Sequence, residues 1–285
     1  MYHLYLILAI AALTVTCQDI FKKKFNQKSS GGVFFFGGMI SFFAMLFFIV
    51  LNRDWSYSSS QLLYSFGFAV AYGAATLFAV LAIKYGSLAK TTLIVSCSLL
   101  LPSFYGIIFL SEPIGIKLIV GIVLLVVALV MINYEKDAVP SSLKWAICAA
   151  LAFVGNGMCS VVQKLEQNTF GSDGQNVFMI VALGMVVLLL FAMSFISKEE
   201  RGRQIRIAKV GWIWAALCGV CNGLCNFLVM YLNPRLPASV MFPVISGGSV
   251  VLVFVYATLV QREKFNLRQK IGYAIGVLSI VLLNI

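Results

Sequence analysis

Charged residues are scarce in this sequence. Only 11% of its 285 residues are Asp, Glu, Lys or Arg, and just ten are acidic, whereas 61% are hydrophobic. The mean hydropathy is +0.98. In a soluble domain about a quarter of the residues are charged and about half are apolar. Because a core this apolar would leave much apolar surface uncovered in water, we infer an integral membrane protein.

The sequence also lacks the motifs of common membrane-bound enzymes and pumps. Its single histidine is His3, so no HExxH zinc motif exists. Neither a pair of intramembrane aspartates nor the phosphate-binding pattern GxxxxGK[ST] occurs. These absences exclude the chemistry of metalloproteases, aspartyl proteases and ATP-driven pumps. We therefore predict a protein that is not an enzyme and that needs no cofactor.

Cysteines are present, but none lies in an outer loop. All seven fall inside apolar segments, so no disulfide framework is expected. Cys218, Cys221 and Cys225 are three and four residues apart and share one face of a helix. A soft metal ion is one interpretation of this face. Packing against a neighbouring helix is favoured, because no histidine or carboxylate accompanies the thiols, and we predict no metal site.

Ten apolar runs of about 20 residues are each long enough to cross a bilayer as a helix. Helices are expected because lipid cannot hydrogen-bond to open backbone groups. The predicted fold class is an all-α integral membrane protein with ten transmembrane helices in two inverted five-helix repeats. The approximate spans are 4–21, 33–51, 62–83, 88–110, 116–133, 143–163, 176–197, 210–231, 238–260 and 267–284.

The two ends of these halves resemble each other in sequence. When residues 111–133 are aligned with 262–284 at an offset of 151, Glu112 matches Glu263 and Gly121 matches Gly272. We predict a first repeat over 1–133, a polar linker over 134–142 and a second repeat over 143–285. Proteins built from two related halves are often transporters, because the halves can move about a site between them.

Basic residues predict the orientation in the membrane. Seventeen of the 21 Lys and Arg lie in the loops on one face, and four lie on the other. Since basic loops stay in the cytoplasm, both termini are predicted outside the cell membrane. The basic face makes anionic lipid a natural partner. Nucleic acid is not expected, because the charges lie in short loops. The oligomeric state is left open, a monomer included.

Ten helices, a half-length repeat and the pairs Glu112–Gly121 and Glu263–Gly272 resemble the drug/metabolite transporter superfamily in its EamA-like branch. The resemblance implies a multi-pass secondary transporter of a small organic metabolite, with two inverted halves and alternating access. The charge bias agrees with inversion, since the link over 111–117 has one basic residue and its counterpart over 261–270 has four. Members of the family are usually drawn with cytoplasmic termini, opposite to the orientation predicted here. The alternative is a lipid-handling protein or flippase of the same fold, with a laterally open groove and basic residues such as Lys84 and Lys90 at headgroup depth.

Neutral polar residues lie at mid-depth in the predicted spans, and no acidic residue does. A neutral, zwitterionic or amphipathic substrate fits such a lining better than a free cation, for which a buried carboxylate or an aromatic cage is expected. Hydrogen bonding between helices without a ligand is the alternative. The SGGS segment after Pro243 is also able to unwind and expose backbone groups. The candidate substrate-binding residues are Tyr72, Thr76, Asn156, Asn222, Asn226 and Ser246.

Carboxylates at a helix start and inside an apolar run are both candidates for ion coupling. Glu112 and Glu263 each lie just before a helix, where a carboxylate stabilises the N-terminal end of the helix dipole, so we assign them a structural role. Asp19 lies inside the first apolar run and is the coupling candidate, with a surface ion pair to a nearby lysine as the alternative.

The charge bias generates a test of orientation. In a cysteine-free variant, a cysteine at Arg203 is expected to resist an impermeant thiol reagent added to intact cells, and a cysteine at Ser172 is expected to react. Labelling at 203 with protection at 172 would overturn the predicted orientation.

Overall fold

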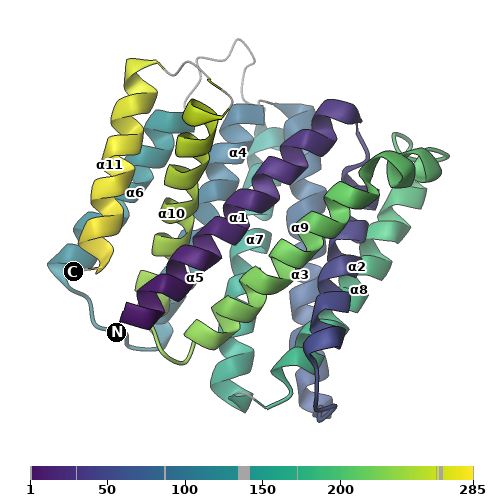
Figure 1. Ribbon diagram of the computed structural model, residues 1–285, viewed down its shortest axis with the longest axis horizontal. Helices are drawn as coiled ribbons and strands as arrows, with labels where there is room; N and C mark the ends of the chain where they lie inside the picture. The colour runs from purple at the N-terminus through teal and green to yellow at the C-terminus, as the bar shows by residue number, and fades with distance from the viewer. Residues whose placement is uncertain are drawn as a thin grey trace. The chain divides into compact units, whose positions relative to one another are not determined.

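The computed structural model describes residues 2–29, 31–86, 88–133, 142–171, 173–260, 262 and 266–284. Helix is the only regular secondary structure in this part of the chain, as the apolar runs predict (Figure 1). The helices are α1 (Tyr2–Lys28), α2 (Val33–Leu51), α3 (Ser59–Tyr85), α4 (Leu88–Ser96), α5 (Leu100–Phe109), α6 (Ile116–Asn133), α7 (Leu143–Phe170), α8 (Gln175–Ile196), α9 (Gln204–Leu232), α10 (Ala238–Leu259) and α11 (Leu267–Asn284). A 3₁₀ turn, η1 (Cys97–Leu99), joins α4 to α5. The linker over 134–141 and Glu263 lie outside the described residues.

Within the described residues, eight helical spans are long and apolar enough to cross a membrane. The two other predicted spans are present as helices α6 and α11, and the first turn of α11 contains Arg268 and Lys270. The total of ten membrane crossings therefore stays a prediction. The sixth span was predicted too short, because α7 continues past residue 163 to Phe170. This extension brings Lys164 and Glu166 into the helix.

The fourth predicted span is not one continuous helix. The run over 88–110 is interrupted by η1, and Pro102 follows in the first turn of α5. Proline has no backbone N–H, so it cannot donate to the carbonyl four residues earlier, which belongs to Ser98. The preceding turn is free to tighten to 3₁₀ geometry, a feature that often marks a functional hinge.

Contacts divide the chain into two units, each of which takes segments from both predicted repeats. Unit 1 comprises Met1–Leu13, Ala74–Val161 and Arg235–Ile285, and unit 2 comprises Thr14–Gly73 and Val162–Pro234. These units do not coincide with the predicted repeats over 1–133 and 143–285, and the division into repeats stays a prediction.

In unit 2, α2 packs between α8 and α9. Gly219 of α9 lies against the α2 backbone, since a Cβ there would be 2.7 Å from the carbonyl oxygen of Ile40. The rings of Phe25 and Phe36 stack with centroids 3.7 Å apart. Lipid supplies no hydrophobic force between helices, so close packing of this kind stabilises the unit.

In unit 1, α6 lies beside α11, and both glycines of the predicted pair line their contact (Figure 1). A Cβ at Gly121 would lie 2.7 Å from the Leu283 side chain, and one at Gly272 would lie 2.9 Å from Met131. Ser279 also donates a 2.7 Å hydrogen bond to the carbonyl of Gly121. The two glycines therefore permit close approach of the last helix of each predicted repeat.

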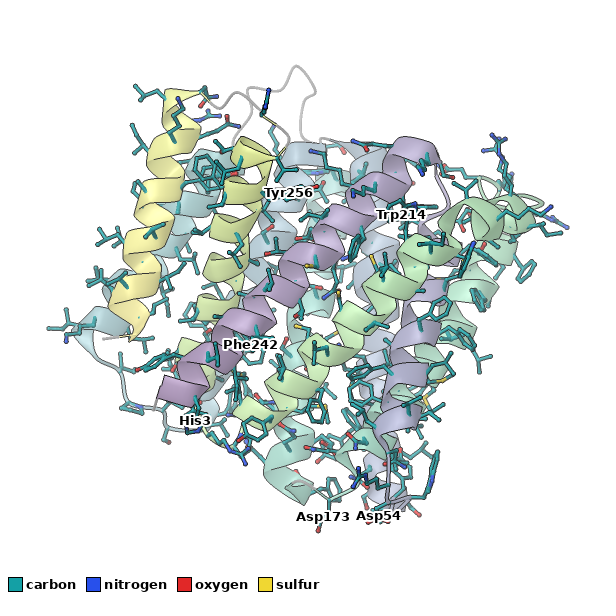
Figure 2. The ribbon with its side chains drawn as sticks, in the orientation of Figure 1. His3, Asp54, Asp173, Trp214, Phe242 and Tyr256 are labelled. Carbon is teal, nitrogen blue, oxygen red and sulfur yellow. The ribbon has the colours of Figure 1, made fainter. Side chains whose placement is uncertain are left out.

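The two ends of unit 2 differ in charge. At one end, Lys24 and Lys28 lie over the ring of Trp214, at 5.3 and 5.2 Å from its centroid. At the opposite end, Asp54 and Asp173 lie close together (Figure 2). By the charge rule, the lysine end is the predicted cytoplasmic end.

Two glutamates hold helix N-termini that are distant in sequence. Glu112 accepts hydrogen bonds from the backbone N–H groups of Ala238 (2.7 Å) and Ser239 (2.9 Å) at the start of α10. Glu200 accepts bonds from Phe34 (2.8 Å) and Phe35 (2.9 Å) at the start of α2. Glu112 thus contacts the N-terminus of α10, whereas the sequence placed it before the adjacent α6.

The capping contacts generate a stability prediction. Glu200 is 3% exposed, and Glu200→Ala leaves the first N–H groups of α2 without acceptors. A hydrogen bond to a charged group contributes about 1.5–3 kcal/mol, so we expect a loss of that order in unfolding free energy. The melting temperature of purified protein measures it, with the exposed neighbour variant Glu199→Ala as control. Equal melting temperatures for the two variants would contradict the capping role.

Candidate functional site

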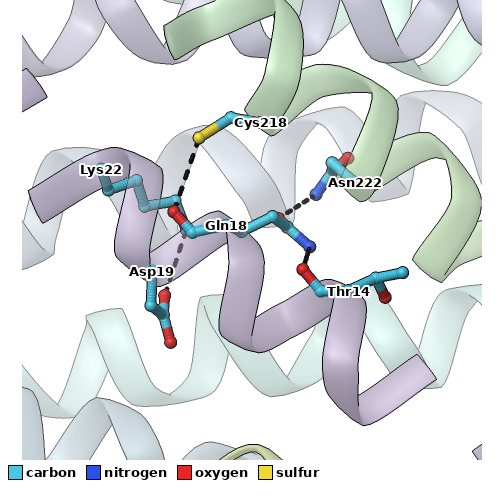
Figure 3. Close-up of polar contacts among 6 residues, drawn as sticks. All are labelled: Thr14, Gln18, Asp19, Lys22, Cys218 and Asn222. Carbon is cyan, nitrogen blue, oxygen red and sulfur yellow. Dashed lines mark hydrogen bonds and ion pairs between the residues drawn. The ribbon is translucent and has the colours of Figure 1, made fainter. Parts of the chain in front are cut away.

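Four amide side chains in unit 2 form a hydrogen-bonded chain across three helices, which we term the amide chain. Asn222 of α9 donates from Nδ2 to Oε1 of Gln18 on α1 at 3.1 Å (Figure 3). Asn226 donates from Nδ2 to Oδ1 of Asn222 at 3.1 Å. Gln163 of α7 donates from Nε2 to Oδ1 of Asn226 at 2.8 Å. The predicted pair Asn222 and Asn226 is therefore together on one face of α9.

The amide chain has both buried and accessible members. Gln18 is 6% exposed and Gln163 is 3% exposed, whereas the two asparagines between them are half-buried. An amide has two N–H donors and an oxygen with two lone pairs. The contacts of Asn222 and Asn226 leave part of this capacity free for a small polar ligand, while the glutamines fix the positions of the two side chains.

Sequence reasoning missed Gln18 and Gln163 as members of this group. Gln18 lies next to Asp19 in the first predicted span, and Gln163 is the last residue of the sixth. The available signal was the recurrence of polar residues at helical spacing over Asn156, Gln163 and Gln167. That recurrence also indicates that α7 continues beyond residue 163.

A second polar group, in unit 1, lies at the interruption between α4 and α5. Asn156 of α7 donates from Nδ2 to Oγ of Ser98 at 2.6 Å, and Ser98 donates to the carbonyl of Val95 at 2.6 Å. The next residue, Gly157, approaches the Ser98 carbonyl so closely that a Cβ would lie 2.6 Å from it. The predicted residue Asn156 thus contacts an interrupted helix, and transporter binding sites are often built from such helices.

The six predicted binding residues divide between the units. Tyr72, Asn222 and Asn226 belong to unit 2, and Thr76, Asn156 and Ser246 belong to unit 1. The ring of Tyr72 lies against Phe68, with centroids 6.2 Å apart. The carbonyl of Ser246 accepts a 2.8 Å bond from Ser249, and α10 is a continuous helix through Pro243 and the following SGGS segment. In this structure the segment that was expected to unwind is helical.

Asp19 lies one residue beyond the amide chain on α1, but its side chain points away from Asn222 and Cys218 (Figure 3). Its carboxylate is 3.7 Å from Nζ of Lys22, and the two side chains are about half exposed, at 52% and 47%. This geometry is that of a surface ion pair. A coupling role for Asp19 stays a hypothesis.

The thiol face of α9 is near the amide chain. Cys218 donates a weak 3.5 Å bond from Sγ to the carbonyl of Gln18. Among the described residues, no cluster of three His, Cys, Asp or Glu side chains has the arrangement to hold a metal ion. In this part of the chain, the chemistry available at the amide chain is therefore hydrogen bonding by neutral groups.

Comparison with known proteins identifies the family. The sequence model of the EamA-like transporter family matches the chain twice, over residues 2–134 and 143–285. No curated protein is matched. One solved structure, a crystal structure described only as that of a protein, is similar with a TM-score of 0.79 and 12% identity. The alignment covers 99% of this chain and 98% of the other. At this identity the likeness shows a shared fold.

The amide chain generates a binding prediction. Asn226→Ala removes a donor and an acceptor from the accessible part of the chain, and a lost hydrogen bond costs about 0.5–1.5 kcal/mol. We expect ligand affinity to fall about two- to twelvefold, because 1.4 kcal/mol corresponds to a factor of ten. The same fall is expected for Asn222→Ala.

The measurement compares ligand binding with melting temperature for each variant, with Cys221→Ala as a control on the same helix. A lower melting temperature with unchanged affinity would show that the asparagines only join helices.

Proposed function

Since the chain belongs to the EamA-like transporter family, we propose that it is a secondary transporter that moves a small organic metabolite by alternating access between two inverted repeats. The predicted family is confirmed by the double match. Members of this family are multi-pass membrane transporters of small molecules. The substrate class, the mechanism and the orientation of the chain are the parts that we propose.

The observation that carries the proposal is the amide chain. Its half-buried asparagines present one N–H group of Asn222 and oxygen lone pairs of both residues, without net charge. Such groups suit a neutral or zwitterionic molecule with several hydrogen-bonding atoms. Hydrogen bonds to the amides replace those that the molecule made to water, so little binding free energy is lost on desolvation. Tyr72 and Asn156, with Thr76 and Ser246, are further proposed ligand contacts.

Loop positions within unit 2 support inversion of the repeats. The turn before α2 lies at the α8–α9 loop, where Glu200 holds the start of α2. The corresponding turn before α8 lies at the α2–α3 loop, where Gln61 donates from Nε2 to the carbonyl of Asp173 at 3.0 Å. These equivalent turns are at opposite ends of the unit, as expected for two halves of opposite orientation.

We also propose a location and a lipid partner. The cell membrane and outward-facing termini follow from the distribution of basic residues. A small polar cleft of about 170 Å³ at the lysine end of unit 2 is lined by Lys28, Arg203 and Arg206, with Glu199 as its acidic residue. Anionic headgroups on the cytoplasmic face are expected to gather at such a cleft.

A lipid flippase is the alternative, and it requires a groove with basic residues at headgroup depth. Unit 1 has an apolar groove of about 650 Å³ between α1, α10 and α11, with Leu6, Leu13 and Val251 among its lining residues. Among the described residues, no Lys or Arg lines this groove. The groove therefore has no cation in its lining to bind a lipid phosphate. For this reason we favour the metabolite transporter, which the amide chain supports, over the flippase.

The proposal predicts exchange without ATP. Purified protein in vesicles preloaded with unlabelled neutral amino acids or nucleosides is expected to accumulate the labelled compound by counterflow, because an alternating-access carrier exchanges substrate across the membrane without net work. Vesicles without protein are the control. Uptake that requires ATP, or no counterflow of any neutral or zwitterionic metabolite, would contradict the proposal.

A further inference from the structure

The last turns of α7 contain a carboxylate that is completely buried. Glu166 is 0% exposed and lies within a helix that is long and apolar enough to cross the membrane. Gln61 of α3 donates from Nε2 to Oε1 of Glu166 at 2.9 Å. The other oxygen, Oε2, has no hydrogen-bond partner in the described part of the protein.

Among the described residues, no ion pair to this carboxylate is found. The ion pair between Lys22 and Asp19 lies elsewhere in unit 2. Lys164, two residues earlier on α7, directs its ammonium group to the carbonyl of Asn233 at 2.5 Å. A buried carboxylate with one neutral donor and no cation is unstable as an anion. A proton on Oε2 removes the charge and leaves the Gln61 bond in place.

We propose that Glu166 is the proton-binding group that couples transport to a proton gradient. The inference rests on the proposed function. In the proposed step, the carboxylate takes one proton from the aqueous phase at the Asp54 and Asp173 end. The carboxyl group stays protonated while the protein changes its access from one side of the membrane to the other with substrate bound. The proton is released to the aqueous phase on the other side.

The titratable groups around Glu166 come from three segments. The α2–α3 loop contributes Tyr57 and Asp54, α7 contributes Lys164, and the α7–α8 loop contributes Asp173, whose carbonyl accepts from the same Gln61 amide at 3.0 Å. Burial raises the pKa of Tyr57, a 3.0 Å bond to Ser65 opposes this, and charge on Glu166 raises it further. The pKa of Tyr57 therefore depends on whether Glu166 carries a charge.

Helical spacing connects Glu166 to the amide chain. Gln163 lies three residues earlier on α7, on the same side of the helix, and bonds to Asn226 at 2.8 Å. One residue after Glu166, Gln167 donates to the carbonyl of Met230 on α9 at 2.9 Å. The same two helices therefore hold the proton-binding carboxyl and the proposed ligand contacts. A movement of α7 or α9 at one of these sites therefore also displaces the residues of the other.

Asp19 has a weaker claim to this role. Its side chain is 52% exposed and pairs with Lys22, so its charge is balanced in water. A coupling carboxylate is expected inside the protein, where Glu166 lies. Asp19→Asn is therefore the matched control for Glu166→Gln, since both changes replace a carboxylate by an amide of the same shape.

Infrared difference spectroscopy tests proton binding directly. On acidification, reconstituted wild-type protein is expected to gain the carbonyl band of a protonated carboxyl in an apolar site. The band is expected to be lost in Glu166→Gln and kept in Asp19→Asn. In the wild type, dicyclohexylcarbodiimide, which modifies protonated buried carboxyls, is expected to label Glu166, as read by mass spectrometry. This second measurement does not depend on the folding of the variant. A band that survives in Glu166→Gln, or no adduct at Glu166, overturns the inference.

Flux measurements separate coupling from transport. With labelled neutral amino acids or nucleosides as probes, wild-type vesicles are expected to accumulate the probe when a pH gradient is imposed. Glu166→Gln is expected to lose this accumulation and keep counterflow exchange. If the wild type exchanges a probe but never accumulates it under a pH gradient, or if Glu166→Gln accumulates it normally, the coupling role is wrong and the transporter stands. If the wild type shows no exchange, the proposed function itself fails.

Discussion

The structure depends on one constraint, which is that lipid neither donates nor accepts hydrogen bonds. It explains why helix is the only regular secondary structure among the described residues, and it also governs the side chains. Each polar group buried between helices needs a partner from the protein or a ligand. Glu200 takes the first N–H groups of α2, and Gln163 bonds to Asn226. Glu166 is a fully buried carboxylate that departs from the rule, with one oxygen unpartnered in the described residues. This combination of burial and a missing partner motivates the proton-binding role that we propose for it.

The same constraint separates stabilising residues from binding residues. Stabilising groups have their bonds completed inside the protein: Gly121 and Gly272 permit close approach of helices, and Glu112 and Glu200 hold helix ends. The half-buried members of the amide chain are different, because they retain hydrogen-bonding capacity. A carrier needs both kinds of residue, since rigid helices transmit movement while the site must exchange water for substrate.

Much of the fold was predictable from composition and periodicity. Apolar runs located the helices, and the offset between Glu112 and Glu263 indicated the family that the double match confirms. The interruption before Pro102 was not predicted, because hydropathy is insensitive to a single missing N–H. Nor was the length of α7: Lys164 and Glu166 resemble loop residues in sequence, and only tertiary contacts with Asn233 and Gln61 make their burial possible. At the site, spacing placed Asn222 and Asn226 on one face. Their glutamine partners come from helices distant in the chain, which spacing along one helix does not identify.

The central claim is that the amide chain faces water and substrate during transport. The most direct measurement is the reactivity of a cysteine at position 226, in a variant without the native cysteines, toward a small hydrophilic methanethiosulfonate added to reconstituted protein. The account predicts that Asn226→Cys reacts, that substrate slows the reaction, and that Leu188→Cys, a 72% exposed position of α8 expected to face lipid, stays inert. A cysteine at 226 as inert as that at 188, with or without substrate, would contradict the account.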